Sequence, residues 1–273
     1  MPELPEVEAV VRNLRAETAW QVILATRVDR CAAPTMARRA TGRSIEAVER
    51  RAKHILIRLS GGMTLHAHLR ISGNLRLIPD GRVHTDYARV VFRLSGGGAL
   101  VLADPRALAR VEVRPSPEID AEMSKLGPEP LSAAFTLERF LTDARASRQP
   151  AKLFLMDQRR VAGLGNIYAA EALFRAGIHP ERPMRSLRRP RLAALYRAIV
   201  EVLRLAVQSA VEAYTGPGLV TEAEVFPVAV YGREGEPCTG CRRKIRRIPQ
   251  GGRSTYFCPG CQPLPAGWRQ RQR

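Results

Sequence analysis

Four of the five cysteines form two Cys-x-x-Cys pairs, Cys238/Cys241 and Cys258/Cys261, with sixteen residues between the pairs. Two such turns at this separation allow a short β-hairpin to hold one zinc ion between four thiolates. Four thiolates fill a tetrahedral site and leave no position for water, so the metal is expected to be structural. We therefore predict a zinc β-hairpin in a compartment that keeps thiols reduced. The fifth cysteine, Cys31, is expected to be an ordinary small core residue.

The charge balance indicates a polyanionic partner. The chain has 44 Lys and Arg against 26 Asp and Glu, a formal net charge of +18. This excess favours nucleic acid, with an anionic membrane surface as the weaker alternative. No uncharged apolar run approaches the length of a membrane span, and we expect a cytoplasmic protein. The segment between the cysteine pairs is either a solvated basic face or a phosphate-contacting finger. Its basic residues are Arg242, Arg243, Lys244, Arg246, Arg247 and Arg253.

The N-terminal segment is a second candidate site. Apolar residues recur with helical spacing from Val7 to Leu14, so Pro2 and Glu3 lie just ahead of a helix. Removal of Met1 would expose Pro2 as a secondary amine able to attack a sugar aldehyde carbon. Glu3 could then act as general acid or base, and Glu6 could orient the backbone. On these residues alone, a plain helix cap is the better interpretation.

The rest of the chain separates into a β-rich half and a helical half. Residues 20–113 alternate with period two and are broken by glycine turns, which predicts a mostly antiparallel β domain. Breakers gather between residues 115 and 130, and helical patterns follow, including 167–175 and 190–214. The turn Gly163-Leu164-Gly165-Asn166 precedes the first of these helices. It fits either a phosphate cradle or a tight turn in which Asn166 caps the helix.

Several segments in order along the chain resemble the formamidopyrimidine-DNA glycosylase and endonuclease VIII family of bifunctional DNA glycosylases. The start, Met1-Pro2-Glu3-Leu4-Pro5-Glu6-Val7-Glu8, is similar to the formamidopyrimidine branch. The other matching segments are Arg51-Ala52-Lys53-His54, His68-Leu69-Arg70-Ile71-Ser72-Gly73, Asp104-Pro105-Arg106, Leu126-Gly127-Pro128-Glu129-Pro130-Leu131, Gly165-Asn166-Ile167-Tyr168-Ala169, and Tyr231-Gly232-Arg233 through the cysteine module.

The resemblance implies an α+β fold in four parts. These are an N-terminal catalytic β-sandwich domain flanked by helices (1–126), a linker (127–134), a helix-two-turn-helix DNA-binding domain (135–228), and a zinc β-hairpin with a basic tail (229–273). It also implies a monomer that binds damaged duplex DNA in the cleft between its lobes. The implied activity is a DNA glycosylase and AP lyase of base excision repair that removes 8-oxoguanine and formamidopyrimidines.

The resemblance assigns roles residue by residue. Pro2 would displace the damaged base at C1′ and form a Schiff base, and Glu3 would be the general acid and base. Lys53 would hold a phosphate beside the lesion, while Asn166 and Arg253 would hold others. Glu6 and Lys152 would support the site, Lys152 near the lesion.

Two regions depart from the family pattern. The family fills the space of the flipped nucleotide with Met, Arg and Phe, and the aligned residues here are Ile71, Arg106 and Leu108. The lesion-capping loop, between Tyr214 and Pro227, is shorter than usual. These changes leave the lesion and the opposite base open: the chain could be specialised for an oxidised pyrimidine or a bulky or alkylated purine. A non-catalytic lesion-binding protein and an RNA-binding zinc ribbon are further alternatives.

The histidines show no spacing for a second metal or a hydrolytic triad. His54, His66 and His68 are therefore expected in packing, on strand surfaces or in phosphate contacts.

Overall fold

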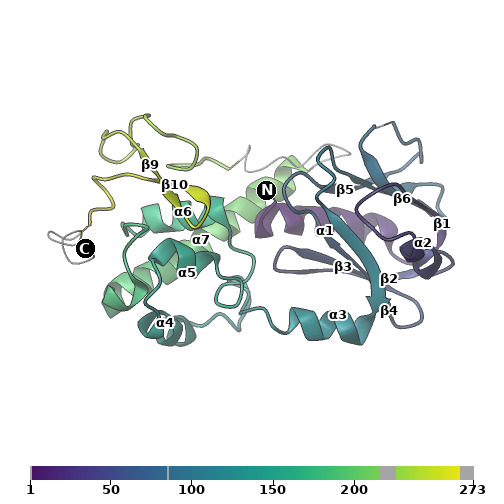
Figure 1. The fold of residues 1–273 in the computed structure, drawn as a ribbon, viewed down its shortest axis with the longest axis horizontal. Coiled ribbons are helices and arrows are strands. Elements are labelled where there is room, and N and C mark those ends of the chain that lie inside the picture. Colours follow the sequence, from purple (N-terminus) through teal and green to yellow (C-terminus); the bar gives the residue numbers. More distant parts are fainter. Residues whose placement is uncertain (1, 85, 215–225, 265–273) are drawn as a thin grey trace. The chain divides into compact units, whose positions relative to one another are not determined.

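The computed structural model of the chain describes residues 2–84, 86–214 and 226–264 (Figure 1). Contacts between residues group the chain into two compact units. The first comprises Met1–Lys125 and Val207–Val225, and the second comprises Leu126–Ala206 and Phe226–Arg273. Helices and antiparallel sheets both contribute, which confirms the predicted α+β class.

Two four-stranded antiparallel sheets form the framework of the first unit, with two short helices beside them, α2 (Thr35–Ala40) and α3 (Ser116–Met123). One sheet has the order β1-β6-β7-β5, and the other has the order β2-β3-β4-β8. The strands of the first sheet are β1 Ile23–Val28, β5 Asn74–Ile78, β6 Ala88–Leu94 and β7 Ala99–Ala103. Those of the second sheet are β2 Ile45–Arg51, β3 His54–Leu59, β4 Met63–His68 and β8 Arg110–Pro115.

The helix α1 (Leu4–Thr18) supplies the apolar stripe that closes the core of this unit. Val7, Val10, Val11 and Leu14 are fully buried, as their i, i+3, i+4, i+7 spacing predicts. They share one apolar cluster with residues of both sheets, such as Ile57 and Phe92. Burying each side chain of this size contributes roughly 1.5–3 kcal/mol. The predicted β-sandwich is confirmed, and its core fixes the N-terminal end of α1.

The second unit is helical and carries one β-hairpin. Its helices are α4 Leu137–Ala146, α5 Ala151–Met156, α6 Asn166–Arg175, the 3-10 turn η1 Met184–Ser186, and α7 Arg189–Ala213. The hairpin consists of β9 (Arg246–Gln250) and β10 (Arg253–Phe257). The helices predicted at 167–175 and 190–214 are observed as α6 and α7.

Gln158 organises the turns that separate α5 from α6. Its Oε1 accepts a hydrogen bond from the Gly163 amide at 2.9 Å, and its Nε2 donates to the Leu164 carbonyl at 2.8 Å. Gly163 has φ +87°, a left-handed conformation that favours glycine. The glycine in the predicted turn is thus required by the backbone.

The C-terminal end of α7 belongs to the first unit, where Ala210 and Tyr214 join the apolar core. Most of the loop predicted to be shortened, residues 215–225, lies outside the described residues. None of the described helices combines the length and hydropathy that a bilayer span requires.

Candidate active site and metal centre

Pro2 and Glu3 are buried at the start of α1, where Glu3 is the N-cap. The Glu3 amide donates to Glu6 Oε2 at 2.7 Å, and the Glu3 carboxylate accepts from the Glu6 amide. This reciprocal capping box satisfies two amides that the helix leaves unpaired. Both carboxylates also lie at the positive end of the helix dipole. Glu3 therefore belongs to both the helix cap and the candidate catalytic pair, and the cap fixes the backbone next to Pro2.

The turn between β2 and β3 carries Lys53, which is buried. Arg50 joins this turn to α1, because its Nε donates to Glu8 Oε2 at 2.7 Å and its Nη1 donates to the Ala52 carbonyl at 3.1 Å. Burial acts to raise the pKa of Glu8, but hydrogen bonds from Arg50 and Arg12 outweigh it and lower the pKa. An ionised Glu8 thus ties the turn that carries Lys53 to the helix that carries Glu3.

Three exposed side chains, Ile71, Arg106 and Leu108, project from two loops of the first unit. Ile71 is 42% exposed and Leu108 is 41% exposed, which is unusual for aliphatic residues of this size. Because they are exposed, the Ile71 and Leu108 side chains are available to a partner. The loops are the ones for which the resemblance implies insertion into DNA.

Asp104 holds these two loops together. Its carboxylate accepts hydrogen bonds from Ser72 Oγ at 2.6 Å and from the amides of Arg106, Leu108 and Ala109 at 3.1, 2.7 and 2.7 Å. Burial acts to raise the pKa of Asp104, but these hydrogen bonds outweigh it and lower the pKa. A buried, ionised Asp104 therefore sets the conformation from which Arg106 and Leu108 project.

We expect Asp104→Asn to lower the free energy of unfolding by about 3 kcal/mol at pH 7, because an amide nitrogen would face backbone donors. Because the folded-state pKa of Asp104 is depressed, its stabilisation is present above the unfolded-state pKa and is lost as the pH falls through the folded-state value. Urea unfolding at several pH values measures both effects. The exposed Asp86 provides the control, and Asp86→Asn should change stability by less than about 0.5 kcal/mol. Equal effects of the two variants would refute this role of Asp104.

In the second unit, Lys152, Asn166 and Arg253 all lie at the β9–β10 hairpin. Lys152 Nζ donates to Thr255 Oγ1 at 2.8 Å and to the Ser254 carbonyl at 3.2 Å. Asn166 Nδ2 donates to the same carbonyl at 3.0 Å. Arg253 is exposed at the start of β10. The α5 and α6 helices thus fix the hairpin next to Arg253.

These contacts exclude one of the two alternatives for Asn166, the helix cap. The N-cap of α6 is Gly165, and the Asn166 side chain reaches the hairpin and does not cap the helix. Lys152 is fully buried, which gives its ammonium group a positioning function within this unit. That Lys152 lies near the lesion stays a prediction.

The four paired cysteines converge on one point. Their Sγ atoms all lie within 4.8 Å of one another, with Cys241 and Cys258 at 3.3 Å and Cys238 and Cys261 at 3.8 Å. Tetrahedral thiolates around zinc are separated by about 3.8 Å when each Zn–S bond is about 2.3 Å. A Cβ atom added at Gly260 would lie 2.8 Å from Cys241 Sγ, so this turn requires glycine. The residues fit one structural zinc ion, and within the described residues they form the only such cluster.

Two acidic residues that organise the site were missed from the sequence. Asp104 is one. Its carboxylate accepts a hydrogen bond from the Arg106 amide two residues later, a local contact that Asp side chains commonly make. The other is Glu171, whose carboxylate accepts the amides of Ala229, Val230 and Tyr231 at 2.8, 3.0 and 2.9 Å. A glutamate on an otherwise apolar helix was the available signal, because such a residue needs buried partners.

Comparison with known proteins matches three segments of the chain to described domains. Residues 1–111 match the formamidopyrimidine-DNA glycosylase N-terminal domain, and residues 126–215 match the formamidopyrimidine-DNA glycosylase H2TH domain. Residues 235–264 match the zinc finger found in FPG and IleRS.

Curated relatives and solved structures are similar to this chain over almost its whole length. The chain is 42% identical to the formamidopyrimidine-DNA glycosylase of Geotalea uraniireducens, over 96% of this chain and 100% of the relative. It is similar to the crystal structure of the Thermus thermophilus MutM (FPG) protein, with a TM-score of 0.84, 39% identity, and coverage of 96% and 98%. The Lactococcus lactis Fpg bound to DNA containing N7-benzyl-Fapy-dG gives a TM-score of 0.87, 31% identity, and coverage of 96% and 100%.

Proposed function

The chain belongs to the formamidopyrimidine-DNA glycosylase family, and from this membership we propose that it excises damaged bases from DNA with Pro2 as nucleophile. It is a DNA glycosylase of base excision repair, and AP-lyase activity is typical of its family. The observation that carries the proposal is the start of α1, where Pro2 precedes the reciprocal cap between Glu3 and Glu6.

Pro2 acts as the amine nucleophile once Met1 has been removed. Its nitrogen forms a bond to the deoxyribose C1′, and the bond from C1′ to the damaged base breaks, with its electron pair leaving on the base. Opening of the sugar then breaks the C1′–O4′ bond and leaves an iminium ion between Pro2 and C1′. Loss of a C2′ proton from this ion eliminates the 3′ phosphate and nicks the strand.

Glu3 supplies and removes protons at the opening sugar. In its acid form it gives a proton to O4′ as the C1′–O4′ bond breaks, and the resulting carboxylate can accept a proton in the later step. The Glu6 carboxylate accepts a hydrogen bond from the Glu3 amide and so restrains the backbone beside the nucleophile. Glu6 is therefore a positioning residue.

The remaining predicted residues hold the DNA. Lys53 takes a phosphate beside the lesion, and Asn166 and Arg253 take phosphates from the second unit. Ile71, Arg106 and Leu108 enter the duplex where the damaged nucleotide has left it. Their exposure and the common anchor of their loops on Asp104 support this role. An aliphatic Leu108 stacks less strongly on bases than an aromatic residue, so DNA kinking is weaker than with phenylalanine.

The substrate and assembly follow from the same proposal. Formamidopyrimidines and 8-oxoguanine in duplex DNA are the proposed lesions, and one relative is solved with DNA containing Fapy-dG. The protein acts as a monomer in this proposal, because one chain supplies the nucleophile, the phosphate ligands and the metal site. The cytoplasm is the proposed compartment.

Borohydride trapping tests the function directly. The protein is incubated with duplexes that carry an abasic site, 8-oxoguanine, a formamidopyrimidine or an oxidised pyrimidine, each opposite C. We expect a covalent adduct with the abasic duplex and with at least one purine lesion, because borohydride reduces the iminium ion to a stable amine. If the oxidised pyrimidine gave the most trapped adduct, the chain would be specialised for another class of lesion, as its altered wedge residues allow. No adduct on any duplex, with an N-terminal proline verified by mass, would favour a lesion-binding protein.

A further inference from the structure

A cluster of arginines without acidic partners lies at the start of the long helix α7. We call it the α7 arginine cluster, and its members are Arg182, Arg185, Arg188 and Arg191. Three of them are exposed, and Arg182 is half-buried. All belong to the second unit. Within residues 2–84, 86–214 and 226–264, none of them forms an ion pair with a carboxylate.

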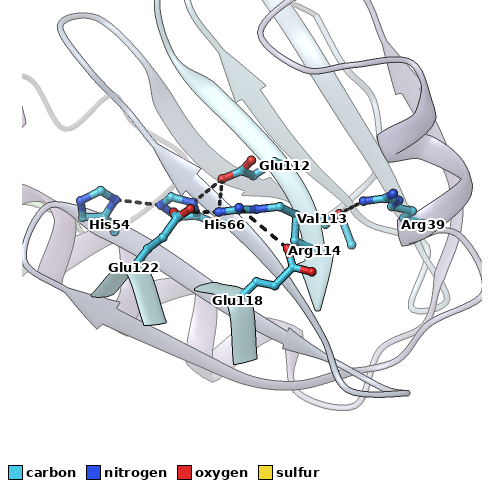
Figure 2. Close-up of polar contacts among 8 residues, drawn as sticks. All are labelled: Arg39, His54, His66, Glu112, Val113, Arg114, Glu118 and Glu122. Carbon is cyan, nitrogen blue, oxygen red and sulfur yellow. Dashed lines mark hydrogen bonds and ion pairs between the residues drawn. The ribbon is translucent and has the colours of Figure 1, made fainter. Parts of the chain in front are cut away.

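Carboxylates neutralise other arginines of this chain. Arg189, between two members of the cluster, pairs with Glu138 at 2.8 Å. In the first unit, Arg114 lies among three glutamates (Figure 2), which are Glu112, Glu118 and Glu122. The absence of acidic partners therefore distinguishes the α7 arginine cluster from these arginines.

Neutral acceptors hold two members of the cluster in place. Arg182 Nε donates to Ser186 Oγ at 3.3 Å, and that hydroxyl donates in turn to the Pro183 carbonyl at 2.8 Å. Arg191 Nη1 donates to the Ala176 carbonyl at 3.3 Å. These contacts orient the guanidinium groups and leave their positive charge uncompensated.

The positive charges of the cluster disfavour one another and the helix. Burial, Arg191 and Arg188 lower the pKa of Arg182. The amides of Arg191 and Leu192 donate to the Arg188 carbonyl, so Arg188 is the N-cap of α7 and Arg191 is its third residue. Serine and glutamate are favourable at these two positions, and cations are not. Folding therefore gains nothing from these charges, whereas an anion would neutralise them.

Hydrogen bonds connect the segment before the cluster to the β9–β10 hairpin. The Pro180 carbonyl accepts from the Lys152 amide at 3.1 Å and from Gln250 Nε2 at 3.2 Å. Gln250 is opposite Arg253 in the hairpin, and Pro180 is two residues before Arg182. The cluster and Arg253 therefore belong to one hydrogen-bonded framework within the second unit.

We propose that the α7 arginine cluster binds the phosphodiester backbone of the duplex outside the lesion, as a phosphate surface additional to Arg253. The inference rests on the proposed function, in which Arg253 holds a phosphate of the damaged duplex. Guanidinium groups suit this partner because their planar donors bind phosphate oxygens in pairs and stay charged. DNA presents its phosphates in a row, so successive arginines can each take one and release counterions.

Salt dependence of DNA binding provides the test. The triple variant Arg185→Gln, Arg188→Gln, Arg191→Gln removes the exposed members of the cluster and keeps the half-buried Arg182. We would measure the Kd of the zinc-loaded protein by fluorescence anisotropy at several NaCl concentrations. One duplex carries a tetrahydrofuran abasic analogue, and an otherwise identical duplex is undamaged.

The triple variant should bind both duplexes more weakly. Each lost phosphate contact removes about 0.9 from the slope of log K against log salt, so the slope should become less steep by about 2 to 3. The Kd should rise at least about tenfold at fixed salt, by the same factor on both duplexes, because phosphate contacts carry no information about the base. A loss confined to the duplex with the abasic analogue would overturn the inference.

Three exposed arginines of the first unit that form no ion pair supply the matched control. They are Arg27, Arg30 and Arg38, and their triple Gln variant has the same net charge as the α7 variant. The control should keep the slope of the wild type within about 0.5. The α7 variant should melt no earlier than the wild type, because cations leave the positive end of a helix. Equal losses of affinity in the two variants would refute the proposed surface, because net charge alone would then explain them.

Inorganic pyrophosphate distinguishes free phosphate from DNA as the source of the phosphate group. Pyrophosphate binding that the α7 variant weakens, with an unchanged slope for DNA, would assign the cluster to a free polyphosphate and overturn the duplex as its partner. Borohydride trapping on the abasic duplex separates the two proposals. An adduct from the α7 variant leaves the glycosylase function standing, whatever the slope shows. If the wild type gives no adduct, the slope on the undamaged duplex still tests the cluster.

Discussion

Replacing Pro2 with glycine is expected to abolish base excision, with a single-turnover rate at least about 1000-fold lower, or about 4 kcal/mol in the activation free energy. Proline presents a secondary amine whose ring holds the nitrogen in one orientation, and attack at C1′ gives an iminium ion directly. Glycine presents a primary amine on a mobile backbone, so both nucleophilicity and orientation are lost. Single-turnover excision of the best lesion, with borohydride trapping in parallel, measures the loss.

Pro5 is the matched control for this change. It lies in the first turn of α1 and is buried, but it has no free amine. Pro5→Ala should lower stability and leave the excision rate within about threefold of the wild type at a temperature where both are folded. Mass spectrometry must verify that Met1 is absent from all three proteins. A Pro2→Gly protein that excises at the wild-type rate would show that water, and not the chain's own amine, attacks the sugar.

Local patterns carried enough information to predict most elements of the fold. Val7, Val10, Val11 and Leu14 are fully buried because helical spacing alone puts them on one face. The cysteine spacing was equally sufficient, since the two turns and the hairpin between them are local structures. These predictions succeeded because each depends on interactions within a few residues or across one turn.

Local sequence patterns did not reveal side-chain contacts between segments that are far apart in the sequence. Asn166 fitted a helix cap equally well, and only the position of Ser254 reveals that its side chain reaches the hairpin. The resemblance placed Lys152 near the lesion, but it did not reveal that the Lys152 ammonium is buried and donates to Thr255 Oγ1. Such pairings depend on how α5 and α6 pack against β10, which no local pattern encodes.

The histidine cluster shows a signal that was present and incompletely used. The spacing His66-x-His68 already places two imidazoles on one face of a strand. The third partner and the carboxylate depend on the register of β4 with β3 and β8, which pairs His68 with His54 and His66 with Glu112. A shift of one residue in either register would separate them.

Loss of one zinc ligand is expected to have the second large effect, on DNA affinity and on the hairpin. Cys258 is fully buried, and its amide donates to Gln262 Oε1 at 2.9 Å, so it anchors both the metal and the end of the module. Structural zinc sites contribute about 10–16 kcal/mol of apparent binding free energy at pH 7. We expect Cys258→Ser to release the ion and unfold the hairpin, because Cys258 also belongs to the small apolar cluster that joins the module to α6, with Ala170, Val230 and Ile245.

Without the hairpin, Arg253 is no longer held beside Asn166, and DNA affinity should fall at least about 100-fold at fixed salt. Elemental mass spectrometry measures the zinc content of each protein. The Kd for a duplex that carries a tetrahydrofuran abasic analogue measures DNA affinity. Cys31→Ser is the control for zinc content, since Cys31 lies outside the metal cluster and this variant should keep one zinc ion per chain. Because the first unit has its own core, Cys258→Ser should retain its β-sheet circular dichroism. A zinc-free Cys258→Ser protein that binds DNA as tightly as the wild type would show that the hairpin does not hold phosphate.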